Sequence, residues 1–201
     1  MIGQVASYLY ECFTKNTYIE MIIKLLILDV DGVLTDGTKF YNEQHQVLGK
    51  RFLCKDFTAL KRFAATGIKV VFLSGDNFNR SMAKKRNVDF YCSRGEDLSL
   101  DKSRFLSLFE QKYNIPLSQM AFVGDDYFDL SMFKSLKQTF CPADAPKIIK
   151  ENASVVLNSP GGAGVIVELY DYFVQNTNLK EASEKEVADL DKKEASSGEM
   201  K

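Results

Sequence analysis

A run of four apolar residues, Leu25–Leu28, is followed directly by two acids, Asp29 and Asp31, and then by a glycine. A short apolar run of this kind is typical of a strand buried in a sheet, whereas acids are poor strand residues. Acids at the carboxyl end of a buried strand therefore indicate a functional site. Side chains two residues apart on an extended strand point the same way. These two carboxylates repel each other unless a cation or a proton lies between them.

Length and composition limit the class of protein. A chain of 201 residues suits one domain with a full core and short tails. The net charge of −1 gives no electrostatic bias toward nucleic acid or anionic lipid. Four widely spaced cysteines without a CxxC pair fit a reducing compartment. We therefore expect a cytoplasmic protein that binds neither nucleic acid nor membranes.

The composition divides the chain into three predicted parts. Residues 1–20 are too interrupted for a membrane span and lack the pattern of a secretory signal. They are either an amphipathic N-terminal extension or the product of an upstream start codon, two alternatives of equal weight. Residues 21–176 form the predicted folded domain. Residues 177–201 are rich in Glu, Lys and Ser, so we expect a charged, disordered tail, with a charged helix as the alternative.

Predicted strands alternate with predicted helices along the domain, which indicates an α/β fold: a Rossmann-like three-layer sandwich with a mostly parallel sheet. Segments 38–41 and 46–53 flank a polar turn and predict a β-hairpin. Asp56 is placed to cap a helix that runs from Phe57 to Ala65. The other predicted strands are 68–74, 89–92, 120–123, 138–141 and 154–157, and the other helices are 77–87, 101–113 (or from 99), one ending near 135, 146–151 and 165–175.

Three of the predicted strands end in polar groups, and a lysine, Lys102, lies at a helix start between the second and third of them. In a parallel sheet such strand ends share one edge, where ligands bind. Carboxylates from two strands suit Mg²⁺, and a lysine with backbone N–H groups suits phosphate oxygens. A carboxylate could attack phosphorus, and a second could move the proton. The strand-end groups are Asp29 and Asp31, Ser74 with Gly75, and Asp125 with Asp126.

Each of these residues also has a plain structural interpretation. Asp125 or Asp126, taken alone, is as often a helix cap or a solvated loop residue as a ligand. The single histidine, His45, lies in a polar run typical of a hairpin tip and is better explained as a solvated loop residue than as a catalytic one. The coincidence of several strand ends and a helix start is much harder to explain without a site.

The order DVDGVLTDG, LSGD, DK and GDDYFDL resembles the four motifs of the haloacid dehalogenase phosphohydrolase superfamily, over roughly residues 22–174. The resemblance implies that Asp29 is the nucleophile and a metal ligand. It implies that Asp31 is the general acid/base, with its backbone carbonyl as another Mg²⁺ ligand. Ser74, together with Gly75, and Lys102 are implied to hold the transferred phosphoryl group.

The last motif carries three acids. The resemblance implies that Asp125 is a metal ligand and that Asp126 supports the metal site directly or through water. Asp129 is implied to orient Lys102 or the loop. The cofactor implied is Mg²⁺.

The spacing between the motifs leaves no room for the cap domains of many superfamily members. Within the superfamily, VDGVLTDG, the hairpin and the late GGAG–VIVE segment are similar to the capless 3-deoxy-octulosonate 8-phosphate phosphatase group, which includes nine-carbon, sialic-type sugar phosphatases. This implies a Mg-dependent phosphomonoesterase that hydrolyses a small sugar-acid phosphate through an aspartyl-phosphate, in lipopolysaccharide or sialic acid biosynthesis. It also implies a homotetramer in which the hairpin acts as a flap over a neighbour's site.

The chain differs from that group where arginines or other basic residues are usual, at Asp76, Ala163 and Val167. Arginines are natural partners of a sugar-acid carboxylate, so these differences bear on the substrate. Four basic residues could substitute: Lys50, Lys55, Arg80 and Arg94. Arg94 is the best candidate among them, and a solvated surface arginine is the alternative.

Two other functions compete with a phosphatase. One is a catalytically degenerate domain that serves oligomerisation or regulation. The other is a phosphoacceptor signalling domain, which also uses strand-end acids, a hydroxyl and a lysine. The position of Asp31 and the late GDD motif argue against the signalling domain.

Overall fold

The first predicted strand lies in the middle of a parallel sheet. The structure is a computed structural model that describes residues 22–94 and 101–199. β1 (Leu25–Leu28) pairs with β4 (Lys69–Ser74) on one side and with β6 (Met120–Val123) on the other, all parallel. The chain thus runs to opposite sides of β1, which makes β1 the switch point where α/β sheets bind ligands. The order of the six strands is β5 (Asp89–Cys92), β4, β1, β6, β7 (Gln138–Cys141) and β8 (Val155–Val156).

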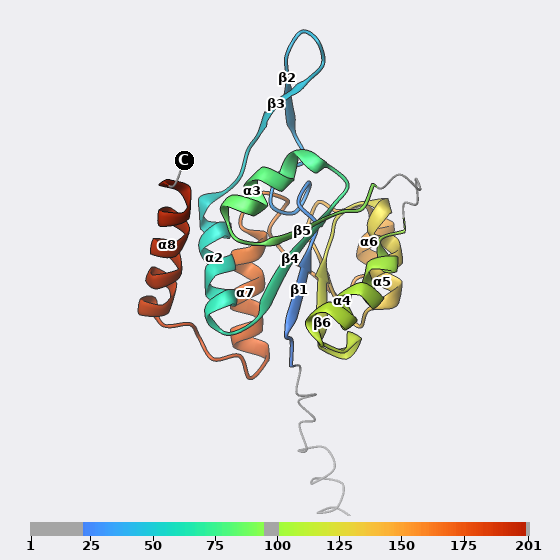
Figure 1. The fold of residues 1–201 in the computed structure, drawn as a ribbon. Helices are drawn as coiled ribbons and strands as arrows, with labels where there is room; N and C mark the ends of the chain where they lie inside the picture. The colour runs from blue at the N-terminus through green and yellow to red at the C-terminus, as the bar shows by residue number, and fades with distance from the viewer. Residues whose placement is uncertain (1–21, 95–100, 200–201) are drawn as a thin grey trace, which may run out of the picture.

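Helices cover both faces of this sheet, as Figure 1 shows. The resulting three layers confirm the predicted α/β sandwich. Within the described ranges, no helix has the combination of length and apolar character needed to cross a bilayer. One face carries α2 (Cys54–Ala65), α3 (Arg80–Lys85) and α7 (Val165–Asn176), and the other carries α4 (Phe105–Tyr113), α5 (Leu130–Ser135) and α6 (Lys147–Asn152).

The strand β1 supplies both layers of the core. Leu26 and Leu28 belong to the apolar cluster beneath α2 and α7, whereas Leu25 and Ile27 belong to the cluster beneath α4 and α5. This division follows from the alternation of side chains along a strand. All four side chains are fully buried, so the acids that follow them start from a fixed position.

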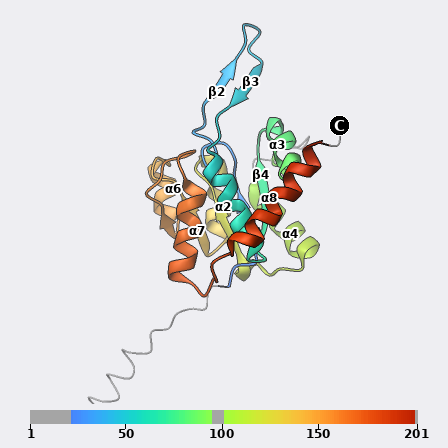
Figure 2. The same cartoon turned by 90° about the vertical axis from the view of Figure 1, so that its left-hand side faces the viewer.

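The predicted hairpin is confirmed as an antiparallel pair, β2 (Lys39–Tyr41) and β3 (Val47–Lys50). It projects from the carboxyl edge of the sheet (Figures 1 and 2). His45 lies in its turn, as expected, with a φ of 60°. The hairpin exposes three large hydrophobic side chains, among them Phe40 (56% exposed) and Leu48 (66% exposed), together with Tyr41.

Asp56 does not cap its own helix, which corrects the prediction. α2 begins three residues earlier than predicted, at Cys54, and Asp56 lies within its first turn. The buried Asp56 carboxylate instead accepts hydrogen bonds from the N–H groups of Ile166 (2.9 Å) and Val167 (3.2 Å) at the start of α7. The residue before α7 is Gly164, which has no side chain to serve as a cap. Asp56 therefore supplies the missing acceptor from a neighbouring helix.

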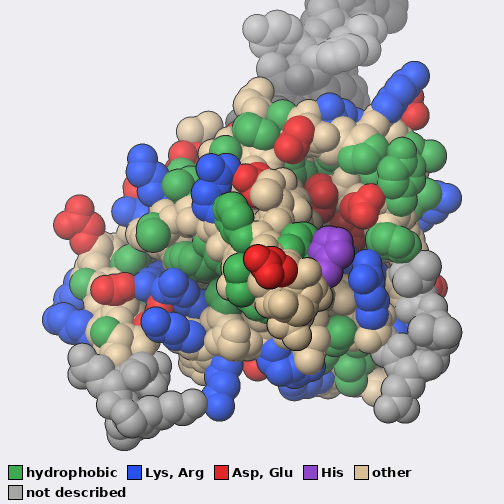
Figure 3. All heavy atoms as spheres, turned by 90° about the horizontal axis from the view of Figure 1, so that it is seen from above, with side chains coloured by type: hydrophobic (Ala, Val, Ile, Leu, Met, Phe, Trp, Pro, Cys, Tyr) green, Lys and Arg blue, Asp and Glu red, His purple; other side chains and the backbone are tan. Residues whose placement is uncertain are grey.

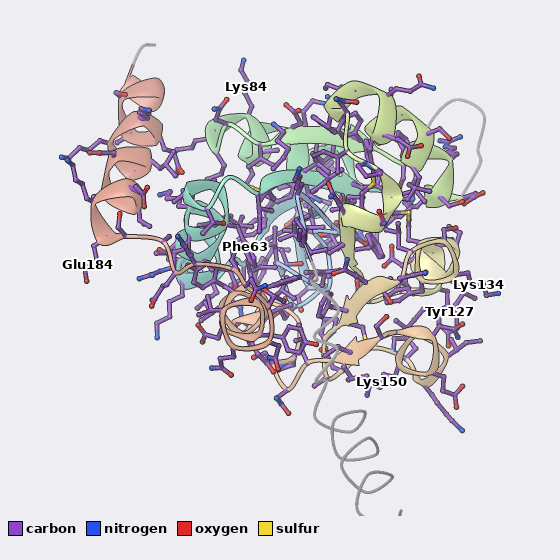
Figure 4. All side chains as sticks on the ribbon, turned by 90° about the horizontal axis from the view of Figure 1, so that it is seen from below. Phe63, Lys84, Tyr127, Lys134, Lys150 and Glu184 are labelled. Carbon is purple, nitrogen blue, oxygen red and sulfur yellow. The ribbon has the colours of Figure 1, made fainter. Side chains whose placement is uncertain are left out.

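The contact between α2 and α7 is otherwise apolar. The ring of Phe63 lies between the two helices (Figure 4), edge to face with Tyr170 at 5.1 Å and near Phe173 at 5.9 Å between ring centroids. Burial raises the pKa of the Asp56 carboxyl in this setting, although the hydrogen bonds from α7 lower it. The polar contact thus sits beside a dry aromatic core, where an unpaired N–H group would be costly.

The tail also differs from the expected disorder, because α8 (Glu184–Glu199) is a helix that lies against α2 and α3 (Figure 2). Glu194 of α8 pairs with Lys61 (3.2 Å) and with Arg86. Val187 packs against the apolar core. The sequence alternative of a charged helix is thus the one found, since partners from other elements offset the ordering entropy. The three-part division stays a prediction, and the N-terminal extension lies outside the described residues.

Replacing Asp56 tests the cap between helices. Asp56→Ala leaves two N–H groups of α7 without acceptors, so we expect the free energy of unfolding to fall by about 1–2 kcal/mol. Asp56→Asn keeps an acceptor oxygen and should lose clearly less. Chemical denaturation of the three proteins measures both differences. Equal losses in the two variants, or no loss in either, would contradict the capping role.

Candidate active site

A cleft of about 260 Å³ opens at the carboxyl ends of β1, β4 and β6, at the base of the hairpin. Figure 3 views the molecule from above and shows acidic side chains gathered beside the hairpin. The structure therefore brings together residues that lie far apart in the sequence. Of the predicted site residues, those lining the cleft are Asp29, Asp31, Ser74, Gly75, Lys102, Asp125 and Asp126, while Asp129 is fully buried.

Asp29 forms the centre of the cleft. Its Oδ1 accepts a hydrogen bond from the N–H of Val30 (2.7 Å), and its Oδ2 accepts one from Nζ of Lys102 (2.8 Å). Burial raises the pKa of Asp29 to about 7 despite the lowering effect of the lysine. The same ammonium also serves Asp129 at 2.6 Å, so it offsets only part of the cost of burying Asp29. Burial alone would lower the pKa of Lys102, but the two carboxylates raise it above its usual value.

Three carboxylates form a cluster around this pair. Oxygens of Asp29, Asp125 and Asp129 all lie within 4.8 Å of one another. Burial, followed by the charges of Asp29 and Asp129, raises the pKa of Asp125 to about 9. Oδ1 of Asp125 is buried and has no hydrogen-bond partner. A cluster with an unpaired carboxylate oxygen could hold a divalent cation.

The approach of β1 to Asp125 depends on a glycine. Gly32 has a φ of +86°, a backbone conformation that favours glycine. A Cβ atom added to it would lie only 1.9 Å from Oδ2 of Asp125. Any side chain at this position would push the acid out of the cluster.

Asp129 connects the lysine to the loop after β6. Its Oδ2 accepts hydrogen bonds from the N–H groups of Asp125 (2.9 Å) and Asp126 (3.1 Å), while Oδ1 binds Lys102. Both orienting contacts expected for Asp129 are thus present together. The side chain of Asp126 instead accepts a hydrogen bond from the N–H of Tyr127 (2.7 Å), at the start of the short helix η4 (Tyr127–Asp129).

Asp31 belongs to a second cluster, with two partners from different elements. Its Oδ2 accepts hydrogen bonds from Nζ of Lys50 (2.9 Å) on β3 and from Nδ2 of Asn79 (3.1 Å). The sequence analysis identifies Lys50 only as a possible substitute cation and does not identify Asn79 as a site residue. Asn79 ends the short helix η1 (Asn77–Asn79), and nothing in a polar helix start shows which polar side chain turns inward. The side chain of Asp31 is not part of the three-carboxylate cluster.

Ser74 lies between these two clusters. Its buried hydroxyl accepts hydrogen bonds from Nδ2 of Asn79 (3.0 Å) and from the N–H of Asp76 (3.2 Å). The carboxylate of Asp76 pairs with Lys39 (2.7 Å) and Lys50 (2.8 Å). Burial opposes ionisation of Asp76, but hydrogen bonds from the two lysines hold its pKa well below the usual range. The acid at position 76 thus pairs with two lysines of the hairpin.

Arg94 is the cation of the cleft that has no carboxylate partner among the described residues. Its guanidinium carbon lies 5.8 Å from the centre of the Phe128 ring, and its side chain passes over Gly75, where an added Cβ would lie 3.0 Å from Nε. The other suggested substitutes lie elsewhere. Arg80 binds Oδ1 of Asn77 (2.8 Å), and Lys55 lines a separate groove between α2 and α7.

The chain is similar to known proteins over most of its length. The profile of a family described as haloacid dehalogenase-like hydrolase matches residues 97–169. The 3-deoxy-D-manno-octulosonate 8-phosphate phosphatase KdsC of Haemophilus influenzae is 31% identical over 153 residues, which span 76% of this chain and 83% of that protein.

Solved structures of phosphatases are also similar to this chain. The cobalt-bound form of the deoxy-D-mannose-octulosonate 8-phosphate phosphatase from Haemophilus influenzae superposes with a TM-score of 0.70 at 30% identity, covering 80% of this chain and 91% of that one. A phosphatase of the same name from Moraxella catarrhalis, solved with magnesium, phosphate and KDO, gives 0.71 over 82% and 94% of the two chains. At 24% identity, this second likeness concerns the fold alone. The chain therefore belongs to the haloacid dehalogenase-like hydrolases, as a phosphatase related to the 3-deoxy-D-manno-octulosonate 8-phosphate phosphatases.

Proposed function

We propose that this chain is a Mg²⁺-dependent phosphomonoesterase that hydrolyses a small sugar-acid phosphate through a phosphorylated Asp29. The observation that carries the proposal is the arrangement of Asp29. It is a buried carboxylate at the cleft, paired with Lys102 and grouped with Asp125 and Asp129. Such a carboxylate is an oxygen nucleophile next to the positive charge that a phosphoryl group requires.

In the first half of the reaction, a carboxylate oxygen of Asp29 attacks phosphorus. A bond from this oxygen to phosphorus forms as the bond from phosphorus to the sugar oxygen breaks. Asp31 donates a proton to the leaving oxygen. In the second half, Asp31 takes a proton from water, the water oxygen attacks phosphorus, and the carboxylate of Asp29 is released with inorganic phosphate.

The phosphoryl oxygens need donors throughout both halves. We assign this role to the Ser74 hydroxyl, the N–H of Gly75 and the ammonium of Lys102, because all three residues line the cleft beside Asp29. Their positions are fixed before substrate arrives, since Ser74 and Lys102 are buried and hydrogen bonded. Donors held in place in this way stabilise charge without reorganisation.

Asp29 and Asp125 are the side chains that we assign to Mg²⁺, with the backbone carbonyl of Asp31 as a third ligand. Asp126 and Asp129 support the site through the loop after β6. The unpaired buried oxygen of Asp125 fits this assignment. When bound, the ion supplies positive charge to the phosphoryl oxygens and relieves the repulsion between the carboxylates.

The substrate class rests on two supports. The Haemophilus influenzae relative carries the name of a sugar-acid phosphatase, and Arg94 offers a guanidinium at the cleft that has no carboxylate partner within residues 22–94 and 101–199. A guanidinium binds a carboxylate through two parallel hydrogen bonds. We therefore assign Arg94 to the carboxylate of the sugar acid, in place of the arginines that Asp76 and Val167 replace.

We further propose a homotetramer in which the hairpin of one subunit covers the cleft of another. The exposed Phe40 and Leu48 support this assembly, because apolar side chains on a projecting hairpin gain from burial against a second surface. A covered cleft would also exclude water from the reaction.

Replacing the nucleophile tests the mechanism. Asp29→Asn should lower kcat at least about 10³-fold, because an amide does not attack phosphorus and the phosphorylated intermediate therefore does not form. Phosphate release from a panel of sugar-acid phosphates measures this. Asp189→Asn, at an exposed aspartate of α8, is the control and should retain the wild-type kcat. A wild-type protein that releases no phosphate from any ester would favour the degenerate-domain alternative.

Replacing the unpaired arginine tests the substrate class. Arg94→Ala should lower kcat/KM for sugar-acid phosphates about 10- to 100-fold. The kcat/KM for p-nitrophenyl phosphate, whose leaving group has no carboxylate, should stay within about twofold. Arg80→Ala, an arginine outside the cleft, should change neither value. Equal losses for both substrates would assign Arg94 to the phosphoryl group instead.

Metal binding should depend on pH with a defined sign. In the folded protein without metal, the pKa values of Asp29 and Asp125 are raised from the ordinary carboxyl value of 3.8 to about 7 and about 9. These two carboxyl groups therefore keep their protons at pH values where the unfolded chain has lost them. The free energy of unfolding of the metal-free protein should therefore fall as pH rises through this range. Mg²⁺ displaces the protons, so its stabilising effect should grow from about pH 5.5 to 8.5.

Thermal unfolding with and without Mg²⁺ at three pH values measures this effect. We expect the increase in Tm caused by Mg²⁺ to be larger at pH 8.5 than at pH 5.5, by several degrees. Asp125→Asn should lose most of the difference. An equal Mg²⁺ effect at every pH in the wild type would contradict the assignment of the cluster.

A further inference from the structure

We propose that Lys50 is a positioning residue, which holds the carboxylate of Asp31 in place for proton transfer, and that the hairpin therefore takes part in the chemistry of its own subunit. The proposal rests on the proposed function, since it assumes that Asp31 moves the proton. The position of the Lys50 side chain is unusual. β3 belongs to a projecting hairpin, yet the side chain of Lys50 has no exposed surface.

Every donor of this lysine is used. An ammonium group has three N–H donors. Nζ of Lys50 donates to Oδ2 of Asp31 (2.9 Å), Oδ2 of Asp76 (2.8 Å) and Oδ1 of Asn79 (3.0 Å). Burying an ammonium is costly unless it is fully paired. Three acceptors, one after β1 and two in the segment after β4, therefore fix its position.

Asn79 completes the same unit. Its amide nitrogen donates to Asp31 (3.1 Å) and to Ser74 (3.0 Å), while its oxygen accepts from Lys50. Asn79 is itself buried. The Asp31 carboxylate is thus held from two sides, by a cation on the hairpin and an amide on η1, and it cannot turn away from the cleft without breaking both contacts.

Asp76 gives this unit its charge balance. Lys50 lies between two carboxylates, Asp31 and Asp76, and Asp76 pairs in turn with Lys39 on the other hairpin strand. An arginine at position 76 would set two cations side by side. The acid at this position therefore matches a buried lysine at position 50 and ties the base of the hairpin to the loop that follows β4.

Proton transfer by Asp31 depends on the orientation of its carboxylate. A proton donor displaced by about 1 Å can cost about 100-fold in rate. Loss of Lys50 should therefore slow the steps that need Asp31 and spare those that do not. Expulsion of a sugar alkoxide needs its proton, whereas p-nitrophenolate is stable enough to leave unprotonated. Attack by water on phosphorylated Asp29 needs Asp31 with either substrate.

The test compares these substrates in Lys50→Met, which keeps the length of the side chain and removes the ammonium. With a sugar phosphate, kcat should fall about 100-fold and KM should change by less than about threefold. With p-nitrophenyl phosphate, rapid mixing should show a burst of about one p-nitrophenolate per active site, followed by slow turnover. The burst arises because the phosphorylated enzyme forms at its normal rate and is hydrolysed slowly.

Lys39→Met is the matched control, since Lys39 pairs with the same Asp76 but does not touch Asp31. It should show no burst. Asn79→Ala removes the second contact to Asp31 and should show the same burst, which keeps the test valid if Lys50→Met fails to fold. A general loss of structure would lower Tm and slow both phases together.

The outcomes separate the two proposals. Active wild-type protein, with no burst in either Lys50→Met or Asn79→Ala, overturns the positioning role alone. Unchanged kcat toward the sugar phosphate in Lys50→Met does the same. Wild-type protein that is silent toward every ester overturns the proposed function, and the role of Lys50 falls with it.

Discussion

Repulsion among acids at one edge of the sheet is the constraint on which the structure of this site depends. Carboxylate oxygens of Asp29, Asp125 and Asp129 lie within 4.8 Å of one another, and among the described residues one buried ammonium, that of Lys102, pairs with this group. A cluster of this kind costs stability. It persists because fully buried strands fix Asp29 and Asp125, and Asp129 binds both the lysine and the loop.

Each of the two buried lysines pairs with one of the two acids of the first motif. Lys102 comes from the helix start after β5 and holds Asp29, whereas Lys50 comes from the hairpin and holds Asp31. Both acids come from one short segment and line the same cleft, yet separate cations hold them. That separation suits the two roles proposed for these acids, because a nucleophile and a proton carrier need different surroundings.

Most of the fold and the main cluster could be predicted from the sequence, because both depend on local patterns. The apolar run before Asp29 and the strand-end positions of Ser74 and Asp125 follow from periodicity and from the geometry of parallel sheets. The misses are all contacts between distant elements. Asp56 looked like a cap for its own helix because a local pattern cannot show that a glycine precedes α7, 108 residues later at position 164.

The same reasoning explains why a charged helix was only the alternative for the tail, and why the position of Asn79 escaped prediction. A charged helix is ordered here by partners on α2 and α3, and composition alone contains no information about such partners. Asn79 is one of several polar residues after β4, and only the tertiary position of Lys50 makes it the inward one.

Charge balance also links the hairpin to the choice of substrate. Asp76 and Asp31 together balance the charges of Lys39 and Lys50, and Lys102 is paired with two acids. These lysines therefore have little charge left for an anionic group outside the phosphate. Among the cations that line the described part of the cleft, Arg94 keeps its full charge for such a group. In the proposed function, the acid at position 76 therefore leaves recognition of a substrate carboxylate to the loop after β5, which carries Arg94.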